Sequence, residues 1–364
     1  MIPNPSMVPA FVVHVCLGLI VALGLVTKWG APASWKRAAA LLALSTGISM
    51  AIGLFTAPSP GGFSKLLVWS WSLAIVFPAT AIALAIRSTP HRAVQVVFAS
   101  LGLASIVLSV YAFVWEPQNL EVTHHRVTSD RVQTPLRIAV IADLQTDAPG
   151  DHERAALQAV VDAKPDLVLF VGDVIQHQDA DDYAKAWAAL RGVVAPLDFD
   201  APLGVYLVEG DSEYPHGDAW IHEAEATGLQ VWPRETTSRA IREDVTLTGF
   251  GLRPSAYPEL EVERPGEGLH VVFGHRPAFA MGEVDADLLL AGHTHGGQVQ
   301  LPGWGPLLTL SKVPRSWAWG RTDLPSGATL LVSRGVGMER AGAPRIRFWC
   351  RPEVMIVDVV PMGD

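Results

Sequence analysis

The first 115 residues of the chain contain no aspartate and no glutamate. All 36 acidic residues lie beyond that point, whereas only six of the 27 lysines and arginines lie before it. The first part therefore carries a formal charge of +6, and the rest, with 21 bases against 36 acids, carries −15. Such a long stretch without acidic side chains is untypical of a water-soluble domain. We therefore divide the chain into residues 1–115 and 116–364.

Cysteine is also scarce, since the chain has only two. Cys16 lies in an apolar run and Cys350 lies far away along the chain, so no internal disulfide and no disulfide-based scaffold are expected. Internal repeats and low-complexity tracts are absent as well. The organisation must therefore come from hydrophobic patterning.

Residues 1–115 contain four apolar runs of about 20 residues, the length that crosses a bilayer core of roughly 30 Å as a helix. Tryptophans at the run ends, Trp29, Trp35 and Trp115, suit the boundary between membrane and water. A set of buried soluble helices is the alternative. We expect four transmembrane helices that anchor the chain, over residues 8–27, 38–57, 66–86 and 93–115.

The loops between these runs differ in positive charge, which predicts their orientation. The second loop has only Lys65, whereas the first and third loops together hold Lys28, Lys36, Arg37, Arg87 and Arg92. Because positively charged loops stay in the cytoplasm, the segment after the fourth run is expected outside it. We therefore expect a multi-pass protein of a bacterial inner or plasma membrane with an extracytoplasmic C-terminal domain.

Residues 116–364 alternate between short apolar runs and helical patterns. Helical spacing covers 150–163 and 182–193. Strands are predicted in LRIAVIAD, DLVLFVGD, GVYLVEGD, VTLTGFG, LHVVFGH, ADLLLAGH, TLLVSRG, RIRFWC and EVMIVDVV. Continuous apolar strands suit sheets that are covered on both faces. This pattern favours an α/β domain in which two mixed sheets form a sandwich with helices outside.

Five of the predicted strands end in an aspartate or a histidine, often after a glycine. The motifs IAD, VGD, EGD, FGH and AGHTHGG supply Asp143, Asp173, Asp211, His275, His293 and His295. One such aspartate alone is usually a turn residue or a helix cap, and one such histidine is usually structural. Ligands at strand ends meet in one crevice, and three carboxylates with three imidazoles suit two divalent metals that share a bridging carboxylate.

This ordered series resembles the calcineurin-like metallophosphoesterases. In that family the order is Asp-x-His, Gly-Asp-x-x-Asp, Gly-Asn-His-Asp or Glu, an isolated His, and Gly-His-x-His. The chain has DLQ, GDVIQ, GDSE, GHRP and GHTH. DLLLAGHTHGGQVQLPGWGPLL and the closing VSRGVGMER and RFWCRPEV look like the membrane-anchored bacterial branch. The resemblance spans nearly all of 120–361 and implies a four-layered α/β/β/α sandwich, here after a four-helix transmembrane region.

The resemblance also implies site roles. Asp143 and His295 would hold the first metal, together with Gln145 at a ligand position, and Asp173 would bridge the two metals. Asp211, His275 and His293 would hold the second metal. The positions implied to be catalytic are those of Asp173, Asp211, Ser212 and His293. No substrate-binding residues are implied.

Three positions depart from the family pattern. Gln145 replaces a histidine ligand and Asp211 replaces an asparagine, so the ligand set moves towards oxygen. Such a set favours Mn²⁺, Mg²⁺ or Fe²⁺ over Zn²⁺, and leaves occupancy of the first site open. Ser212 replaces a histidine that assists the leaving group. Either the leaving group needs no acid, as in a pyrophosphate, or another group serves, the candidates being His152, His177, His216 and Glu213. Gln176, in GDVIQ, has no assigned role.

The combined expectation is a membrane-anchored, metal-dependent hydrolase that cleaves a phosphodiester or pyrophosphate bond by attack of a metal-bound hydroxide. The segment GWGPLLTLSKVPRSWAWGR interleaves Trp304, Trp317 and Trp319 with Lys312, Arg315 and Arg321. This mixture suits the lipid headgroup region, so the substrate can be lipid-linked, although tryptophans that merely pack are an equal alternative. With a charge of −15 on the second segment, nucleic acid is not an expected partner.

Two other functions remain open. A catalytically impaired membrane protein that binds a metal or a phosphorylated ligand is the main alternative, and Ser212 is its best support. In a weaker one, the four helices form a channel or transporter subunit. Against it, the apolar runs hold no acid and, besides Cys16 and Tyr111, only His14 as a titratable group, whereas such pathways usually carry ionisable residues.

Overall fold

The computed structural model describes residues 7–29, 34–59, 61–88, 91–340 and 342–363. The chain forms two compact units, and we describe each by itself. The first comprises Met1–Trp115 with Ala341–Ile346, and the second comprises Glu116–Arg340 with Arg347–Asp364.

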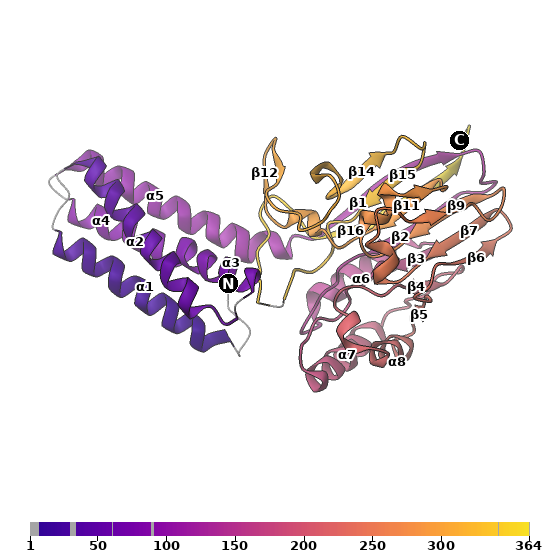
Figure 1. Ribbon diagram of the computed structural model, residues 1–364, viewed down its shortest axis with the longest axis horizontal. Helices are drawn as coiled ribbons and strands as arrows, with labels where there is room; N and C mark the ends of the chain where they lie inside the picture. Colours follow the sequence, from indigo (N-terminus) through magenta and orange to yellow (C-terminus); the bar gives the residue numbers. More distant parts are fainter. Residues whose placement is uncertain (1–6, 30–33, 60, 89–90, 341, 364) are drawn as a thin grey trace. The chain divides into compact units, whose positions relative to one another are not determined.

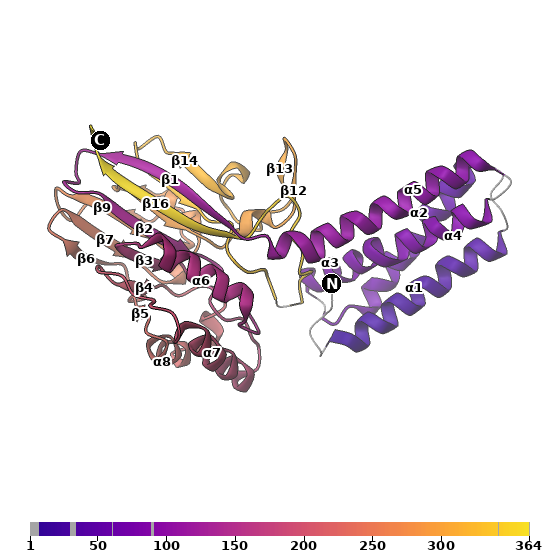
Figure 2. The same ribbon diagram turned by 180° about the vertical axis from the view of Figure 1, so that it is seen from behind.

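The first unit is helical, as Figures 1 and 2 show. Its helices are α1 (Val8–Lys28), α2 (Trp35–Thr56), α3 (Gly62–Trp71), α4 (Phe77–Arg87) and α5 (Arg92–Val110). A π-helical turn, Ser72–Val76, joins α3 to α4 into one helix, and α5 continues through further turns to Gln118. The result is four helices that are long and apolar enough to cross a membrane. The predicted four apolar helices are thus confirmed.

A buried polar cluster links three of these helices. His14 of α1 pairs through Nδ1 with Thr56 Oγ1 at 3.0 Å and through Nε2 with Ser72 Oγ at 2.9 Å. Ser49 Oγ lies 2.9 Å from the same Ser72 Oγ. Polar side chains in apolar surroundings are stabilised by such interhelical hydrogen bonds. His14, the one histidine in these runs, is therefore hydrogen-bonded to neighbouring helices through both ring nitrogens.

The second unit contains two six-stranded mixed sheets (Figures 1 and 2). The first sheet has the order β1 (Glu121–Ser129), β16 (Glu353–Pro361), β2 (Leu136–Ile141), β3 (Leu167–Phe170), β4 (Val205–Leu207) and β5 (Gln230–Val231). Strands β2 to β5 are parallel, and β16 is antiparallel to β2. Between the parallel strands, the chain crosses over through α6 (Asp151–Ala163), α7 (Ala180–Val194) and α8 (Ala219–Ala226).

The second sheet has the order β14 (Gly320–Asp323), β15 (Thr329–Val332), β11 (Leu288–Ala291), β9 (Leu269–Phe273), β7 (Val245–Gly249) and β6 (Thr237–Arg242). Its four central strands are parallel and both edge strands are antiparallel. Two small ribbons, β8 (Glu261–Val262) with β10 (Glu283–Val284) and β12 (Gln300–Leu301) with β13 (Gly305–Pro306), lie outside the two sheets.

Alternating side chains along the strands build three separate cores. On β2, Ile138 and Val140 pack between the two sheets, whereas Ala139 and Ile141 pack against α6 and α7. On the second sheet, the outer face packs instead against the 3-10 turn Pro277–Met281, which in turn contacts the short helix α9 (Leu252–Ser255). The layer order is therefore α/β/β/α with a thin fourth layer, and the predicted fold class is confirmed.

Two errors in the predicted strands concern RIRFWC and β1; β5, β6 and β14 were not predicted either. RIRFWC does not form a strand; only Phe348 makes an isolated bridge, to Val299. The reason is Arg347, whose buried guanidinium donates to the backbone carbonyls of Arg334, Gly335 and Gly337 and so needs irregular backbone around it. The second error is β1, which was not predicted because its sequence, EVTHHRVTS, carries mostly polar side chains.

Candidate metal centre

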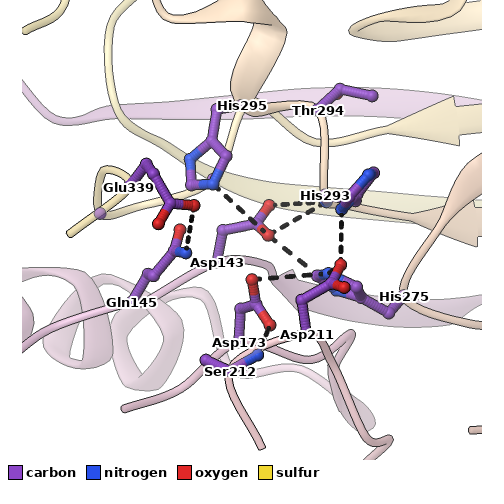
Figure 3. Close-up of polar contacts among 12 residues, drawn as sticks. Asp143, Gln145, Asp173, Asp211, Ser212, His275, His293, Thr294, His295 and Glu339 are labelled. Carbon is purple, nitrogen blue, oxygen red and sulfur yellow. Dashed lines mark hydrogen bonds and ion pairs between the residues drawn. The ribbon is translucent and has the colours of Figure 1, made fainter. Parts of the chain in front are cut away.

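The six metal-ligand candidates at strand ends come together where the two sheets meet (Figure 3). The first sheet supplies Asp143 after β2, Asp173 after β3 and Asp211 after β4, and the second sheet supplies His275 after β9 and His293 and His295 after β11. All five of these strands are central and parallel, so their carboxyl ends point to one edge. The fold therefore converts five separate motifs into one site.

The backbone is strained at this site. Among the described residues, nine other than glycine have a positive φ, and five of these are predicted ligands. They are Asp143 (47°), Gln145 (37°), Asp173 (55°), His293 (70°) and His295 (49°). Each left-handed residue of this kind costs about 1–3 kcal/mol and persists where the surrounding structure demands it. Strain concentrated on one set of side chains is typical of a functional site.

The glycines before these ligands allow close approach. A Cβ atom on Gly210 would lie 2.4 Å from the backbone nitrogen of Asp173. A Cβ atom on Gly172 would lie 2.6 Å from His275 Nδ1, and the φ of Gly172 is +89°. Any side chain at either position would displace a ligand candidate. The VGD and EGD motifs thus need glycine for steric reasons.

One group of ligand atoms comprises Asp211, His275 and His293, whose donor atoms lie within 4.8 Å of one another. Asp211 Oδ2 is 3.0 Å from His293 Nδ1 and 3.3 Å from His275 Nε2. Nδ1 of His275 must donate to the Val171 carbonyl, 2.8 Å away, so Nε2 is the nitrogen that carries the lone pair when the ring is neutral. That Nε2 is buried and has no hydrogen-bond partner in the described part of the chain. Histidines that ligate metals are held in this way by a backbone carbonyl.

The second group comprises Asp143, Asp173 and again His275, also within 4.8 Å. Asp173 Oδ2 lies 3.5 Å from His275 Nε2, and its Oδ1 accepts the backbone N–H of Ser212 at 2.7 Å. Asp143 accepts the backbone N–H of His293. His275 therefore lies beside both groups, whereas the resemblance implied that it serves the second metal alone. Asp173 stands beside it, where a shared carboxylate is expected.

Gln145 and His295 lie beside Asp143. His295 Nε2 is 3.9 Å from Asp143 Oδ1, and its buried Nδ1 finds no hydrogen-bond partner among the residues that the structure describes. Gln145 donates from Nε2 to Glu339 Oε2 at 3.1 Å, and no other described residue bonds to its buried Oε1. Gln145 Oε1 and His275 Nε2, both buried and unpaired among the described residues, are atoms that a cation would coordinate, and His295 Nε2 lies beside Asp143. The donor set therefore fits divalent metal ions.

The electrostatics agree with a cation site. Burial, reinforced by the charge of Asp173, raises the pKa of Asp143 to about 8. Burial alone would lower the pKa of His275, but Asp173, Asp211 and Asp143 raise it to about 10. Burial also opposes ionisation of Asp211, yet the neighbouring His275, His293 and Arg276 hold the pKa of Asp211 well below its usual range. Without a metal, protons must balance the buried carboxylates.

Ser212 and Glu213 form hydrogen bonds that hold the backbone around the metal centre. Ser212 Oγ donates to Glu213 Oε1 at 3.0 Å, so its hydroxyl proton points away from the ligand atoms. The fully buried Glu213 carboxylate also accepts the backbone N–H groups of Asp173, Val174 and Gly210. Burial and the neighbouring Asp173 raise the pKa of Glu213 to about 7. Glu213 thus fixes the backbone around Asp173.

The histidines considered as substitute acids are each engaged with a backbone carbonyl. His152 Nε2 lies 3.0 Å from the Val336 oxygen, and His177 Nε2 lies 2.8 Å from the Asp147 oxygen. His216 Nε2 lies 3.0 Å from the His177 oxygen, and its ring stacks on Tyr183. Because a carbonyl only accepts, each of these nitrogens must donate. The structure therefore brings none of these three into the described groups of ligand atoms.

Two contacting residues were not singled out from the sequence. Arg276 pairs with Asp211, and Glu339 contacts Gln145. Arg276 follows His275 directly in FGHRP, so its position next to a ligand candidate could have identified it from the sequence. Glu339 lies in VSRGVGMER, about 160 residues beyond GDVIQ, and no spacing rule connects it to the site. Only the fold brings it there.

An apolar segment lies beside the His295 loop. It includes β12, β13 and the following loop, and its exposed side chains are Leu301, Trp304, Leu307, Leu308 and Leu310. A Cβ atom on Gly297 would lie 2.5 Å from the Leu308 carbonyl, so the two loops are in contact. Arg315 lies over the Trp304 ring at 5.0 Å. Trp317, in contrast, packs against the outer core of the second sheet.

Comparisons with known proteins agree with this geometry. Residues 136–297 match the model of the family described as calcineurin-like phosphoesterase. The chain is 27% identical over 263 residues to a Bacillus subtilis protein named uncharacterized metallophosphoesterase YkuE, covering 68% of this chain and 87% of that protein. It is also 27% identical over 270 residues to the phosphodiesterase YaeI of Escherichia coli, covering 69% of this chain and 92% of that protein.

A further relative is named transmembrane protein with metallophosphoesterase domain, from Bos taurus. It is 26% identical over 226 residues, covering 54% of this chain and 49% of that protein. The family match begins at β2 and ends in the His295 loop, so it contains all six strand-end ligand candidates. This part of the chain is therefore a calcineurin-like metallophosphoesterase domain, and the chain is a phosphoester hydrolase.

Proposed function

We propose that the chain is a membrane-anchored, metal-dependent hydrolase of phosphodiester or pyrophosphate bonds. The convergence of Asp143, Asp173, Asp211, His275, His293 and His295 on one edge of the sandwich carries this proposal. Residues 1–115 would form the membrane anchor and residues 116–364 the phosphoesterase domain. The name of the E. coli relative, a phosphodiesterase, supports this bond type.

Two divalent ions would supply a nucleophile that is active near neutral pH and positive charge for the phosphoryl oxygens. Asp143, Gln145 and His295 would hold the first ion, and Asp211, His275 and His293 the second. Asp173 would lie between them, with its backbone held by Glu213. Arg276, next to His275 and about one-third exposed, is a cation that would face the negative phosphoryl group at the rim of the site.

The substrate's leaving group is proposed to need little acid assistance. The Ser212 hydroxyl donates a hydrogen bond to the Glu213 carboxylate, and His152, His177 and His216 donate from Nε2 to backbone carbonyls. General acid help normally contributes about 10²–10⁴-fold, so an enzyme without it favours substrates whose leaving group is stable as an anion. A phosphate leaving group, as in a pyrophosphate, meets this requirement.

A lipid-borne substrate is supported by two observations. The last long apolar helix ends at Gln118 and β1 begins at Glu121, so only two residues connect the proposed anchor to the phosphoesterase domain. The apolar segment beside the His295 loop exposes Trp304 by 64% and Leu310 by 66%. Exposed tryptophan and leucine next to arginine suit the headgroup region of a bilayer. A substrate held in that bilayer would reach the metal centre from the membrane surface.

The test uses the full-length chain in lipid nanodiscs, stripped of metal and supplied with Mn²⁺. Hydrolysis of an aryl phosphodiester and of a lipid-linked pyrophosphate is compared between the wild type and Asp173→Asn. We expect turnover that requires metal and is lost in the variant, with the pyrophosphate preferred. Metal binding without hydrolysis of either substrate would contradict the proposal and favour a binding protein.

The location of the domain is tested separately. The distribution of positive charge over the loops supports a location of the phosphoesterase domain outside the cytoplasm. We expect a C-terminal fusion to a reporter enzyme that is active only outside the cytoplasm to be active. An inactive fusion, with a cytoplasmic fluorescent reporter active instead, would reverse the proposed orientation.

A further inference from the structure

Three polar side chains from distant parts of the sequence form a continuous hydrogen-bonded series. Gln176 Nε2 donates to Glu339 Oε1 at 2.6 Å, and Gln145 Nε2 donates to Glu339 Oε2 at 3.1 Å. The carboxylate of Glu339 therefore accepts one amide on each of its oxygens. Figure 3 shows Glu339 directly beside Gln145, with His295 on the same side.

The outer end of the series is anchored to the backbone. Gln176 Oε1 accepts the backbone N–H of Arg340 at 2.6 Å, so both ends of its amide have a defined partner. The backbone N–H of Glu339 donates to Gln298 Oε1 at 3.0 Å. The Arg340 guanidinium donates from Nε to the Gln145 carbonyl at 2.9 Å. Rotation of the Gln176 amide or of the Glu339 side chain would therefore break at least one of these hydrogen bonds.

The amide of Gln145, at the other end of the series, then has one possible orientation. An ionised carboxylate only accepts hydrogen bonds, so the atom of Gln145 that faces Glu339 must be the NH₂ group. The other atom, Oε1, is buried and has no hydrogen-bond partner among the described residues. An amide oxygen can coordinate a cation, whereas the NH₂ group cannot. The orientation of this amide therefore decides whether Gln145 is a ligand.

We infer that Glu339 is a positioning residue: it holds Gln145 with its amide oxygen directed to the first metal, and Gln176 holds Glu339. This inference rests on the proposed two-metal centre. It also gives Gln176 a role and explains why two glutamines and a glutamate occur together here. A histidine at position 145 would present a lone pair without any amide to orient, whereas glutamine needs a partner that only accepts.

The test measures binding of Mn²⁺ to the metal-stripped full-length chain, by calorimetry and by the electron paramagnetic resonance of free Mn²⁺. Glu339→Gln has nearly the same shape, but its single oxygen can accept only one of the two amides. We expect the affinity of one of two bound Mn²⁺ ions to fall by about 10–100-fold, as for other partners of metal ligands. Glu283→Gln, at an exposed glutamate of β10, is the matched control and should leave both affinities unchanged.

A double-mutant cycle with Gln145→Ala separates positioning from direct ligation. If Glu339 acts through Gln145, the double variant binds Mn²⁺ no more weakly than Gln145→Ala alone. Additive losses would show that Glu339 acts on the metal independently, and would overturn the inference. Unchanged Mn²⁺ binding in Glu339→Gln, or a wild type that binds fewer than two Mn²⁺ ions, would overturn it too.

The unfolding temperature of each metal-free variant shows whether the fold is intact. A fall in that temperature for Glu339→Gln that accounts for the weaker Mn²⁺ binding would assign Glu339 a structural role and contradict the inference. Because the readout is metal binding, the inference and the proposed function fail separately. A chain that binds two Mn²⁺ ions through oriented Gln145 but cleaves no phosphoester would refute only the latter.

Discussion

Arg276 forms a two-pronged ion pair with Asp211 at the rim of the metal centre. Its Nε donates to Asp211 Oδ2 at 3.0 Å, and its Nη2 contacts Oδ1. Because Arg276 follows His275 in the chain, one strand end supplies both an imidazole and a guanidinium to the same carboxylate. The family pattern has a neutral asparagine where this chain has Asp211. The extra negative charge is therefore balanced by an arginine next to it.

We predict that Arg276→Gln lowers kcat/KM by about 10–100-fold while two metals still bind, because Asp211 loses the fork that orients it. Arg276→Lys should recover little, since an ammonium cannot form the two-pronged contact. Steady-state kinetics and metal analysis measure both quantities. Arg137→Gln is the control, because Arg137 makes the same kind of pair with Asp358 at the opposite end of β2. Equal effects of the two substitutions would contradict this role.

Replacing Gln145 by histidine should change the metal preference. The substitution exchanges a hard oxygen donor for a nitrogen donor, which suits Zn²⁺ better than Mn²⁺. We expect the ratio of Zn²⁺ to Mn²⁺ affinity to rise by about tenfold or more in Gln145→His. Competition titrations with a metal-sensitive dye measure this ratio. An unchanged ratio would mean that residue 145 does not touch a metal.

Metal binding should strengthen as the pH rises. In the metal-free fold the pKa of Asp143 is raised to about 8 and that of His275 to about 10, so both groups bear a proton at pH 7. A metal must displace these protons, and its affinity should rise by about tenfold per pH unit for each proton released. Calorimetry in buffers of different ionisation enthalpy counts the protons. Affinity that is constant between pH 6 and 8 would contradict this assignment.

The same shift sets the pH dependence of stability without metal. Asp143 has a higher pKa in the folded chain than in the unfolded chain, where it is near 4. Such a carboxyl favours folding most strongly at a pH below the pKa of the unfolded state. That contribution is lost as the pH rises through about 8. The unfolding temperature of the metal-free chain should therefore decline over this range, and the stabilisation by Mn²⁺ should grow.

Gly210→Ala should disturb the shared carboxylate. The new Cβ atom would lie 2.4 Å from both the backbone nitrogen and Oδ1 of Asp173, so Asp173 must move. Overpacking of this kind costs about 1–3 kcal/mol of stability. We expect a folded variant with weaker binding of both metals. Gly192→Ala, at a helical position of α7 with no atom near the added Cβ, is the control. Normal metal binding in Gly210→Ala would show that the position of Asp173 is not critical.

Much of this site was predictable because its ligands are local to strand ends. A buried strand that stops at Asp143 or Asp173 needs only the chain's own hydrophobic pattern to be recognised. Parallel strands then bring their carboxyl ends together, so the six ligand candidates could be grouped before the fold was known. The α/β/β/α layering followed from the same continuous apolar runs, which require cover on both faces.

The remaining contacts depend on long-range packing that no local pattern encodes. Glu339 reaches Gln145 because the loop after β15 lies against Asp143, where the backbone N–H of Gly337 donates to the Asp143 carbonyl at 2.7 Å. Arg347 supports that loop through several carbonyls, and for this reason its apolar neighbours do not form the predicted strand. Contacts such as these, between residues far apart in the sequence, can be identified only in the folded structure.

Two metals in this centre are proposed to drive hydrolysis together. The most direct measurement follows hydrolysis of an aryl phosphodiester by the metal-stripped full-length chain as Mn²⁺ is added in known equivalents. We predict that the rate rises until two Mn²⁺ ions are bound per chain and then stays constant, and that Asp173→Asn shows no turnover at any concentration. A rate that saturates at one equivalent, or equal turnover in Asp173→Asn, would contradict the account.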